Sequence, residues 1–206
     1  MEARVEVVEA SLEDVLSSLD AHTLLDGDER ARAARFRNAE ARDRFLAGRG
    51  LLRALLGERL GRPPGAVRLR LEANGRPVLA DPDARVRFSV SHAGDRVVVA
   101  LADRDVGVDI ERLRPLPDAL DLARRFFAAG EVAVLASEPL DRRADVFLVL
   151  WTRKEALLKA RGLDLADGLA SPASGQAGFD VRALEVAAGF VAAVAARGSD
   201  WAVVRR

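Results

Sequence analysis

Lysine occurs at only two positions of this sequence, Lys154 and Lys159, and every other Lys/Arg position is arginine. We expect so arginine-biased a chain to keep lysine where a compact, flexible ammonium is needed instead of a planar guanidinium. Glu155 lies between the two lysines, and Asp109 and Glu111 stand two positions apart upstream. Carboxylates and lysine at the ends of apolar segments indicate a site for a divalent metal and a phosphate.

Asp109 and Glu111 fall in a short apolar segment that is predicted to be a strand. Residues i and i+2 of a strand point to the same face, about 6–7 Å apart along the chain. Both carboxylates could therefore reach one Mg²⁺, which takes one or two carboxylates together with waters and phosphate oxygens. The alternative that spacing alone leaves open is a solvent-facing strand that carries two acids.

Glu155 and Lys159 stand at positions i and i+4 of a predicted helix and so share one face. The alternative is an ordinary surface Glu–Lys pair. The scarcity of lysine and the bulky apolar residues Trp151 and Leu158 favour a position near a buried edge. If this helix faces the strand with Asp109, Glu155 adds a third carboxylate and becomes a plausible general base.

Ser91 and His92 close another predicted strand. A histidine at that position could donate to a phosphate oxygen and titrates near neutral pH; the alternative is a hydrogen-bonding turn residue. The pair does not indicate a hydrolase, because neighbouring strand residues point to opposite faces and the sequence has no Gly-x-Ser-x-Gly motif. Arg76 follows an Asn-Gly turn signal, so its side chain could project over a cleft. Neither a Walker loop nor a Gly-x-Gly-x-x-Gly motif is present.

Composition narrows the class of protein. The 206 residues are 50 % hydrophobic and 31 % charged with zero formal net charge, which is typical of a soluble globular protein and argues against a non-specific nucleic-acid binder. The absence of cysteine excludes disulfides, thiol nucleophiles and thiolate zinc sites. We find no secretory signal and no run of about 20 apolar residues. We therefore expect a cytoplasmic protein with no membrane partner.

Periodicity and turn signals predict a mixed order of helices and strands. The predicted strands are 5–9, 67–71, 86–91, 96–102, 106–110, 179–186, 190–196 and 201–205. One predicted helix starts at Ser11. The other predicted helices are 28–60, with a break near Asn38, 118–127 and 141–162. Residues 164–178 are predicted to form a loop. Strand, long helix and strands occur in each half, which indicates two similar lobes, residues 1–104 and 105–206.

Three ordered blocks carry a resemblance to a known family. They are Asn74-Gly-Arg-Pro77 leading to Phe88-Ser-Val-Ser-His92, then Val106-Gly-Val-Asp-Ile-Glu111, then Trp151-Thr-Arg-Lys-Glu155 with Lys159. Together they resemble the 4′-phosphopantetheinyl transferases, specifically the larger monomeric type that activates surfactin synthetase. The resemblance implies an α+β fold, a pseudo-dimer of two similar α/β lobes with the active site at their interface.

The resemblance also implies an activity, which is transfer of the phosphopantetheine arm of coenzyme A to a serine of an apo acyl or peptidyl carrier protein. Adenosine 3′,5′-bisphosphate is the other product. Asp109, Glu111 and Glu155 would hold Mg²⁺ in the C-terminal lobe, and Glu155 would take the serine proton directly or through water. The groups that would contact the coenzyme are Arg32, Arg76, Ser91, His92 and Lys159. The departures from the family pattern are Ser89, Glu29 and Phe45.

Two other classes of function stay open at this point. The chain could be a non-catalytic module that binds coenzyme A or a carrier protein, although a mere binder needs no third carboxylate. It could also be an Arg-rich RNA-binding protein, but few aromatic residues (5 %) and zero net charge argue against base stacking. The sequence does not say which carrier protein or pathway is served.

Overall fold

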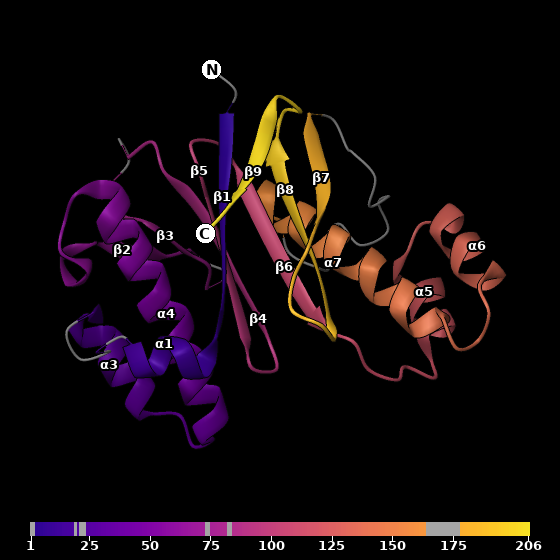
Figure 1. The fold of residues 1–206 in the computed structure, drawn as a ribbon, viewed down its shortest axis with the longest axis horizontal. Coiled ribbons are helices and arrows are strands. Elements are labelled where there is room, and N and C mark those ends of the chain that lie inside the picture. The colour runs from indigo at the N-terminus through magenta and orange to yellow at the C-terminus, as the bar shows by residue number, and fades with distance from the viewer. Residues whose placement is uncertain (1–2, 19, 21–23, 73–74, 82–83, 164–177) are drawn as a thin grey trace.

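The computed structural model describes residues 3–18, 20, 24–72, 75–81, 84–163 and 178–206. It has an α+β fold in which two main β-sheets lie between two groups of helices. The helices α1, α3 and α4 cover one side, and α5, α6 and α7 cover the other (Figure 1). Within the described part of the chain, no helix is both long enough and apolar enough to cross a membrane.

The elements of the first half are β1 (Ala3–Ser11), α1 (Leu12–Ser18), α3 (Gly27–Ala34), α4 (Ala39–Leu60), the 3-10 helix η1 (Pro64–Ala66), β2 (Leu69–Leu71), β3 (Pro77–Leu79), β4 (Arg87–Ala93) and β5 (Arg96–Ala102). Those of the second half are β6 (Val106–Arg112), α5 (Ala119–Phe126), α6 (Ala129–Ser137), α7 (Arg143–Arg161), β7 (Phe179–Leu184), β8 (Phe190–Arg197) and β9 (Trp201–Arg205).

The two halves share one topology. In the first half β1 pairs antiparallel with β5, which pairs antiparallel with β4, and α4 lies between β1 and this hairpin in sequence. In the second half β6, α7 and the β7–β8 hairpin repeat that arrangement. The repeat confirms the expected α+β pseudo-dimer. The last strand, β9, pairs parallel with β1 and so joins the first sheet, while the domain division after residue 104 stays a prediction.

The core lies on both faces of the first sheet. Along β5, Val98 and Ala100 pack between the two sheets, against Val108 of β6. The alternate residues Val97 and Val99 pack on the other face, towards α4. This two-sided burial explains why β5 is an unbroken apolar run after Arg96, with no polar face.

Local capping signals in the sequence set several helix ends. Ser11 Oγ accepts a hydrogen bond from Asp14 N at 3.0 Å ahead of α1, and Asn38 Oδ1 accepts one from Ala41 N at 3.1 Å as α4 begins. The predicted break near Asn38 is thereby confirmed. Helix α7 ends at Arg161 and is capped by Gly162, whose φ of 68° suits glycine. The predicted loop 164–178 lies almost wholly outside the described residues.

Helix α6 was not predicted from the sequence. It lacks a side-chain N-cap and carries Gly130 near its start, so no capping residue marks it. It begins instead where the Glu131 carboxylate accepts a hydrogen bond from Ala128 N at 3.0 Å. Helix α6 is further stabilised by packing against α5 and α7 through the buried Leu135.

Candidate active site

One face of β6 meets helix α7. Asp109 and Glu111 point to that face, while Val106, Val108 and Ile110 enter the core between the sheets. At Gly107 on the same face, an added Cβ would lie 2.0 Å from the Ala156 carbonyl oxygen. Only glycine allows the strand and the helix to approach so closely, and this approach brings the side chains of α7 to Asp109.

Helix α7 contributes Glu155 and Lys159 from one face. Lys159 Nζ lies 2.6 Å from Asp109 Oδ1 and 4.0 Å from Glu155 Oε2. The two carboxylate oxygens are therefore no farther apart than the sum of these distances. The helix carrying Glu155 thus faces the strand carrying Asp109, which is the arrangement that the sequence argument required.

The other lobe reaches this cluster through two serines of β4. Ser91 Oγ donates to Asp109 Oδ1 at 2.7 Å and accepts from Lys159 Nζ at 3.2 Å. Two residues earlier, Ser89 Oγ accepts a hydrogen bond from Val108 N at 3.1 Å. The cluster therefore lies at the interface between the lobes, and both serines bind β6.

Burial and mutual repulsion perturb the acids. The pKa of Glu155 is raised to about 7, first by burial and then by the charges of Asp109 and Glu111, against the opposing effect of Lys159. The pKa of Glu111 is also raised by burial and by Asp109, although Arg114 Nη1 lies 3.2 Å from its carboxylate. Three carboxylates that lie close together create a site with strong attraction for a cation.

The donor set suits Mg²⁺, although the side chains do not form a preassembled cage. No group of three or more His, Asp or Glu residues in the described part of the chain is arranged to hold a metal ion. The donors are hard oxygens, which Mg²⁺ prefers. In addition, Asp109 Oδ2 is buried and makes no hydrogen bond to the described residues, and a bound cation would satisfy it.

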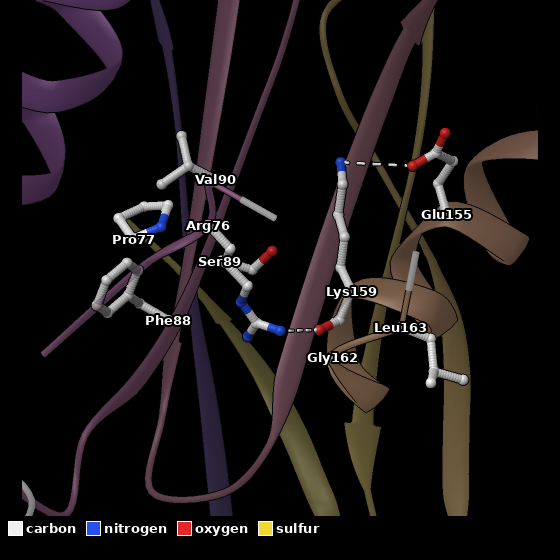
Figure 2. Close-up of a pocket in the computed structure, with 10 residues that line it drawn as sticks. Arg76, Pro77, Phe88, Ser89, Val90, Glu155, Lys159, Gly162 and Leu163 are labelled. Carbon is white, nitrogen blue, oxygen red and sulfur yellow. Dashed lines mark hydrogen bonds and ion pairs between the residues drawn. The ribbon is translucent and has the colours of Figure 1, made fainter. Parts of the chain in front are cut away.

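A pocket of about 350 Å³ opens beside the cluster. Figure 2 shows residues of both lobes around it: Arg76, Pro77, Phe88, Ser89 and Val90 from the first lobe, and Glu155, Lys159, Gly162 and Leu163 from the second. Arg76 Nη1 donates to the Lys159 carbonyl oxygen at 2.6 Å. Arg76 thus forms part of the wall and joins the end of α7 to the first lobe.

A second pocket of about 170 Å³ contains His92, Arg44, Arg49 and Phe45. His92 is on the opposite face of β4 from Ser91, as the strand alternation predicts. The side chain lies at the surface, but neighbouring protein desolvates it and lowers its pKa, and Arg44 and Lys159 lower it further. The lowered pKa favours the neutral form of His92.

Arg49 is a candidate binding residue that the sequence analysis missed. Its side chain is 10 % exposed, its Nε lies 3.2 Å from Glu29 Oε1, and its Nη1 is buried without a hydrogen-bond partner among the described residues. Nothing in the local sequence marks it, because its partner Glu29 belongs to another helix. Arg32, which the resemblance placed at the coenzyme, is exposed on α3 with its guanidinium 5.1 Å from the Phe45 ring centre.

The two lysines differ in their surroundings. Lys154 is buried away from the carboxylate cluster, 2.6 Å from Glu131 Oε2 and 5.0 Å from the centre of the Phe127 ring. It joins α7 to α6. Lysine scarcity therefore identifies two places where a compact ammonium fits, of which Lys159 alone lies beside Asp109.

Comparisons with known proteins agree with this geometry. Residues 15–104 match the 4′-phosphopantetheinyl transferase N-terminal family, and residues 105–192 match the 4′-phosphopantetheinyl transferase superfamily.

Three relatives illustrate the similarity. The chain is 41 % identical over 165 residues to the 4′-phosphopantetheinyl transferase HetI of Nostoc sp. (strain PCC 7120), which covers 79 % of this chain and 65 % of HetI. It is 38 % identical over 144 residues to the transferase psf-1 of Bacillus pumilus, covering 70 % of this chain and 60 % of psf-1. It is 30 % identical over 145 residues to the transferase Sfp of Bacillus subtilis (strain 168), covering 70 % of this chain and 63 % of Sfp. The matched part thus spans less than two thirds of each relative. Because the two family models together match residues 15–192, the chain belongs to the 4′-phosphopantetheinyl transferase superfamily.

Proposed function

We propose that this protein transfers the 4′-phosphopantetheine arm of coenzyme A to a serine hydroxyl of an apo acyl or peptidyl carrier protein. The observation that carries the proposal is the interface cluster, where Asp109, Glu155 and Lys159 meet beside a pocket that both lobes line. Membership of the superfamily supports the same reaction. In this reaction a serine O–P bond forms, and the P–O bond to the adenosine bisphosphate breaks.

The cluster supplies the groups that phosphoryl transfer needs, since that chemistry depends mostly on positioning and charge neutralisation. Asp109, Glu111 and Glu155 would hold Mg²⁺, which neutralises charge on the diphosphate when bound. Glu155, kept ionised by the cation that it helps to hold, would accept the serine proton directly or through water. Lys159 would donate to the phosphate oxygens and stabilise the charge on the departing group.

The two pockets offer separate places for the coenzyme. The diphosphate would lie in the pocket that contains Lys159 and Arg76. The 3′-phosphate would lie in the pocket with His92 and Arg49, whose buried Nη1 is available as a donor. Because one chain supplies both lobes, we propose that the enzyme acts as a monomer, and we place it in the cytoplasm.

The test incubates the protein with coenzyme A, Mg²⁺ and apo-carrier proteins of fatty-acid, polyketide and nonribosomal-peptide synthesis, followed by mass spectrometry of the carriers. We expect at least one carrier to gain the mass of phosphopantetheine, with the complementary loss of coenzyme A. EDTA and Glu155→Gln should each abolish the gain, while circular dichroism shows an intact fold. Normal transfer by folded Glu155→Gln would refute the role of this residue. Binding of coenzyme A without transfer to any carrier would favour the non-catalytic module instead.

A further inference from the structure

The ammonium group of Lys159 is surrounded by oxygens of the proposed metal site. Its Nζ donates to Asp109 Oδ1 at 2.6 Å, to Ser91 Oγ at 3.2 Å and to the Val108 carbonyl oxygen at 3.3 Å. Glu155 Oε2 lies 4.0 Å away. A lysine ammonium has three N–H donors, and each finds an acceptor here. Carboxylate, hydroxyl and carbonyl oxygens are also the ligand types of a hard divalent cation.

We propose that Lys159 is an internal counter-ion of these carboxylates, and that a divalent cation displaces its ammonium from Asp109 when it binds. The proposal rests on the proposed function only in that the site takes such a cation. Even on Asp109 Oδ2, which makes no hydrogen bond to the described residues, a cation would lie close to an ammonium held at Oδ1, because both oxygens belong to one carboxylate. Both carry positive charge in a site where the Asp109 side chain is only 7 % exposed, so their repulsion is weakly screened.

As a counter-ion, Lys159 offsets the repulsion among the acids. Asp109 and Glu111 both raise the pKa of Glu155, and Lys159 opposes them. Lysine suits a displaceable cation better than arginine does, because its ammonium sits on a flexible stem and makes no planar, two-pronged contact. Its backbone stays fixed meanwhile, since the Lys159 carbonyl binds Arg76 and helix α7 packs on Gly107.

Displacement would also place the ammonium where the reaction needs it. Lys159 lines the 350 Å³ pocket as well as the cluster, so an ammonium released from Asp109 remains within reach of that pocket. Cation binding and the availability of Lys159 to phosphates are then thermodynamically linked. Lys159 would then be available to the phosphates before the carrier serine reacts.

The first test uses the unaltered protein and its two lysines. Amines are labelled by reductive methylation with and without Mg²⁺ or Mn²⁺, in the absence of coenzyme A and carrier, and peptide mapping gives the rate at each lysine. An ammonium held by three oxygens should react slowly. We therefore expect a saturating concentration of the cation to raise the labelling rate of Lys159 by at least about threefold. Lys154, whose side chain is 1 % exposed, serves as the internal reference and should not change. A rate at Lys159 that stays constant or falls, or failure of both cations to bind, would overturn the proposal.

The second test measures Mn²⁺ affinity by calorimetry. Lys159→Met removes the competing charge and should tighten binding about tenfold or more, the equivalent of about 1.4 kcal/mol. Lys159→Arg keeps the charge and should give no gain. Arg161→Met removes a positive charge from an exposed position of the same helix and should leave the affinity unchanged. Unchanged or weaker binding by folded Lys159→Met would contradict the proposal, and if that variant does not fold, the labelling result decides.

The outcomes separate this inference from the proposed reaction. Neither test contains coenzyme A or a carrier, so displacement can be shown even if no carrier is modified. In that case the transfer reaction fails and the counter-ion role stands. Transfer to a carrier with no change at Lys159 on cation binding would leave the proposed function intact and remove only this inference.

Discussion

Gly107 of β6 and Ala156 of α7 are in direct backbone contact, so that a Cβ at position 107 would lie 2.0 Å from the Ala156 carbonyl oxygen. The same atom would lie 2.4 Å from Ala160 N. Both obstacles are helix backbone, which cannot rotate aside as a side chain would. The contact therefore sets the distance between the strand with Asp109 and the helix with Lys159.

Gly107→Ala is expected to push α7 away from β6. Overpacking of this kind costs about 1–3 kcal/mol, and more where backbone must move. For a chain of this size each kcal/mol lowers the melting temperature by about 2–4 °C. We expect a fall of several degrees in a thermal melt together with a large loss of transfer activity, because Glu155 and Lys159 on α7 move away from Asp109 on β6.

Gly130→Ala is the matched control for that prediction. Gly130 lies within helix α6, and an added Cβ would meet nothing within 4 Å. Alanine should stabilise the helix by about 0.5–1 kcal/mol. Equal stability of the two variants would show that the β6–α7 contact is less tight than the structure indicates.

Local patterns predicted part of the site, and packing determined the rest. Alternation on β6 placed Asp109 and Glu111 on one face, and helical spacing paired Glu155 with Lys159. These relations hold within a single element. The hydrogen bond from Ser91 to Asp109 and the ion pair between Glu29 and Arg49 join different elements. The periodicity of a single strand or helix does not predict how two elements pack against each other.

The scarcity of lysine predicted only part of the functional assignment. It identified Lys159, which lies in the cluster, and equally Lys154, which forms a buried ion pair with Glu131. Both lysines form close ion pairs with a carboxylate, so the rarity of lysine alone does not separate them. Only the packing of α6 and β6 on opposite parts of α7 distinguishes the structural lysine from the one beside the carboxylates.

Glu155→Gln is expected to change the pH dependence of stability. Because the pKa of Glu155 is raised to about 7 in the folded protein, folding favours its protonated form. The native state therefore loses stability as pH rises from the ordinary pKa of glutamate through 7, by up to about 3 kcal/mol. In EDTA, urea unfolding at pH 5 and pH 8 should show a steeper loss for the wild type than for the variant.

Magnesium should narrow that difference between the wild type and Glu155→Gln. A bound cation stabilises the ionised carboxylate, so the wild type should regain stability at pH 8 when EDTA is replaced by Mg²⁺, and the variant should gain less. Parallel pH curves for the two proteins in EDTA would show that Glu155 has an ordinary pKa.

Ser89→Ala and Ser91→Ala should separate a structural from a functional hydrogen bond on one strand. Ser89→Ala leaves the buried Val108 N–H without its acceptor, which should cost about 1–3 kcal/mol of stability. Ser91→Ala leaves Asp109 bound to Lys159 and should cost less stability, but it frees the carboxylate to rotate. We expect Ser91→Ala to raise the Mg²⁺ concentration needed for half-maximal transfer, and Ser89→Ala to change mainly the melting temperature. The reverse pattern would contradict these assignments.

Arg49→Met should weaken the recognition of the 3′-phosphate of coenzyme A. Arg49 is held by Glu29, is desolvated enough to lower its pKa, and keeps a buried Nη1 in the pocket with His92. A charge-assisted hydrogen bond contributes about 1.5–3 kcal/mol, so the KM for coenzyme A should rise by about 10- to 100-fold. With 3′-dephospho-coenzyme A the wild type already lacks this contact, and the substitution should then have little effect. Arg59→Met, at an exposed position of the same helix, controls for the loss of charge and should leave both KM values unchanged. An equal rise in KM for both substrates on Arg49→Met would place the 3′-phosphate elsewhere.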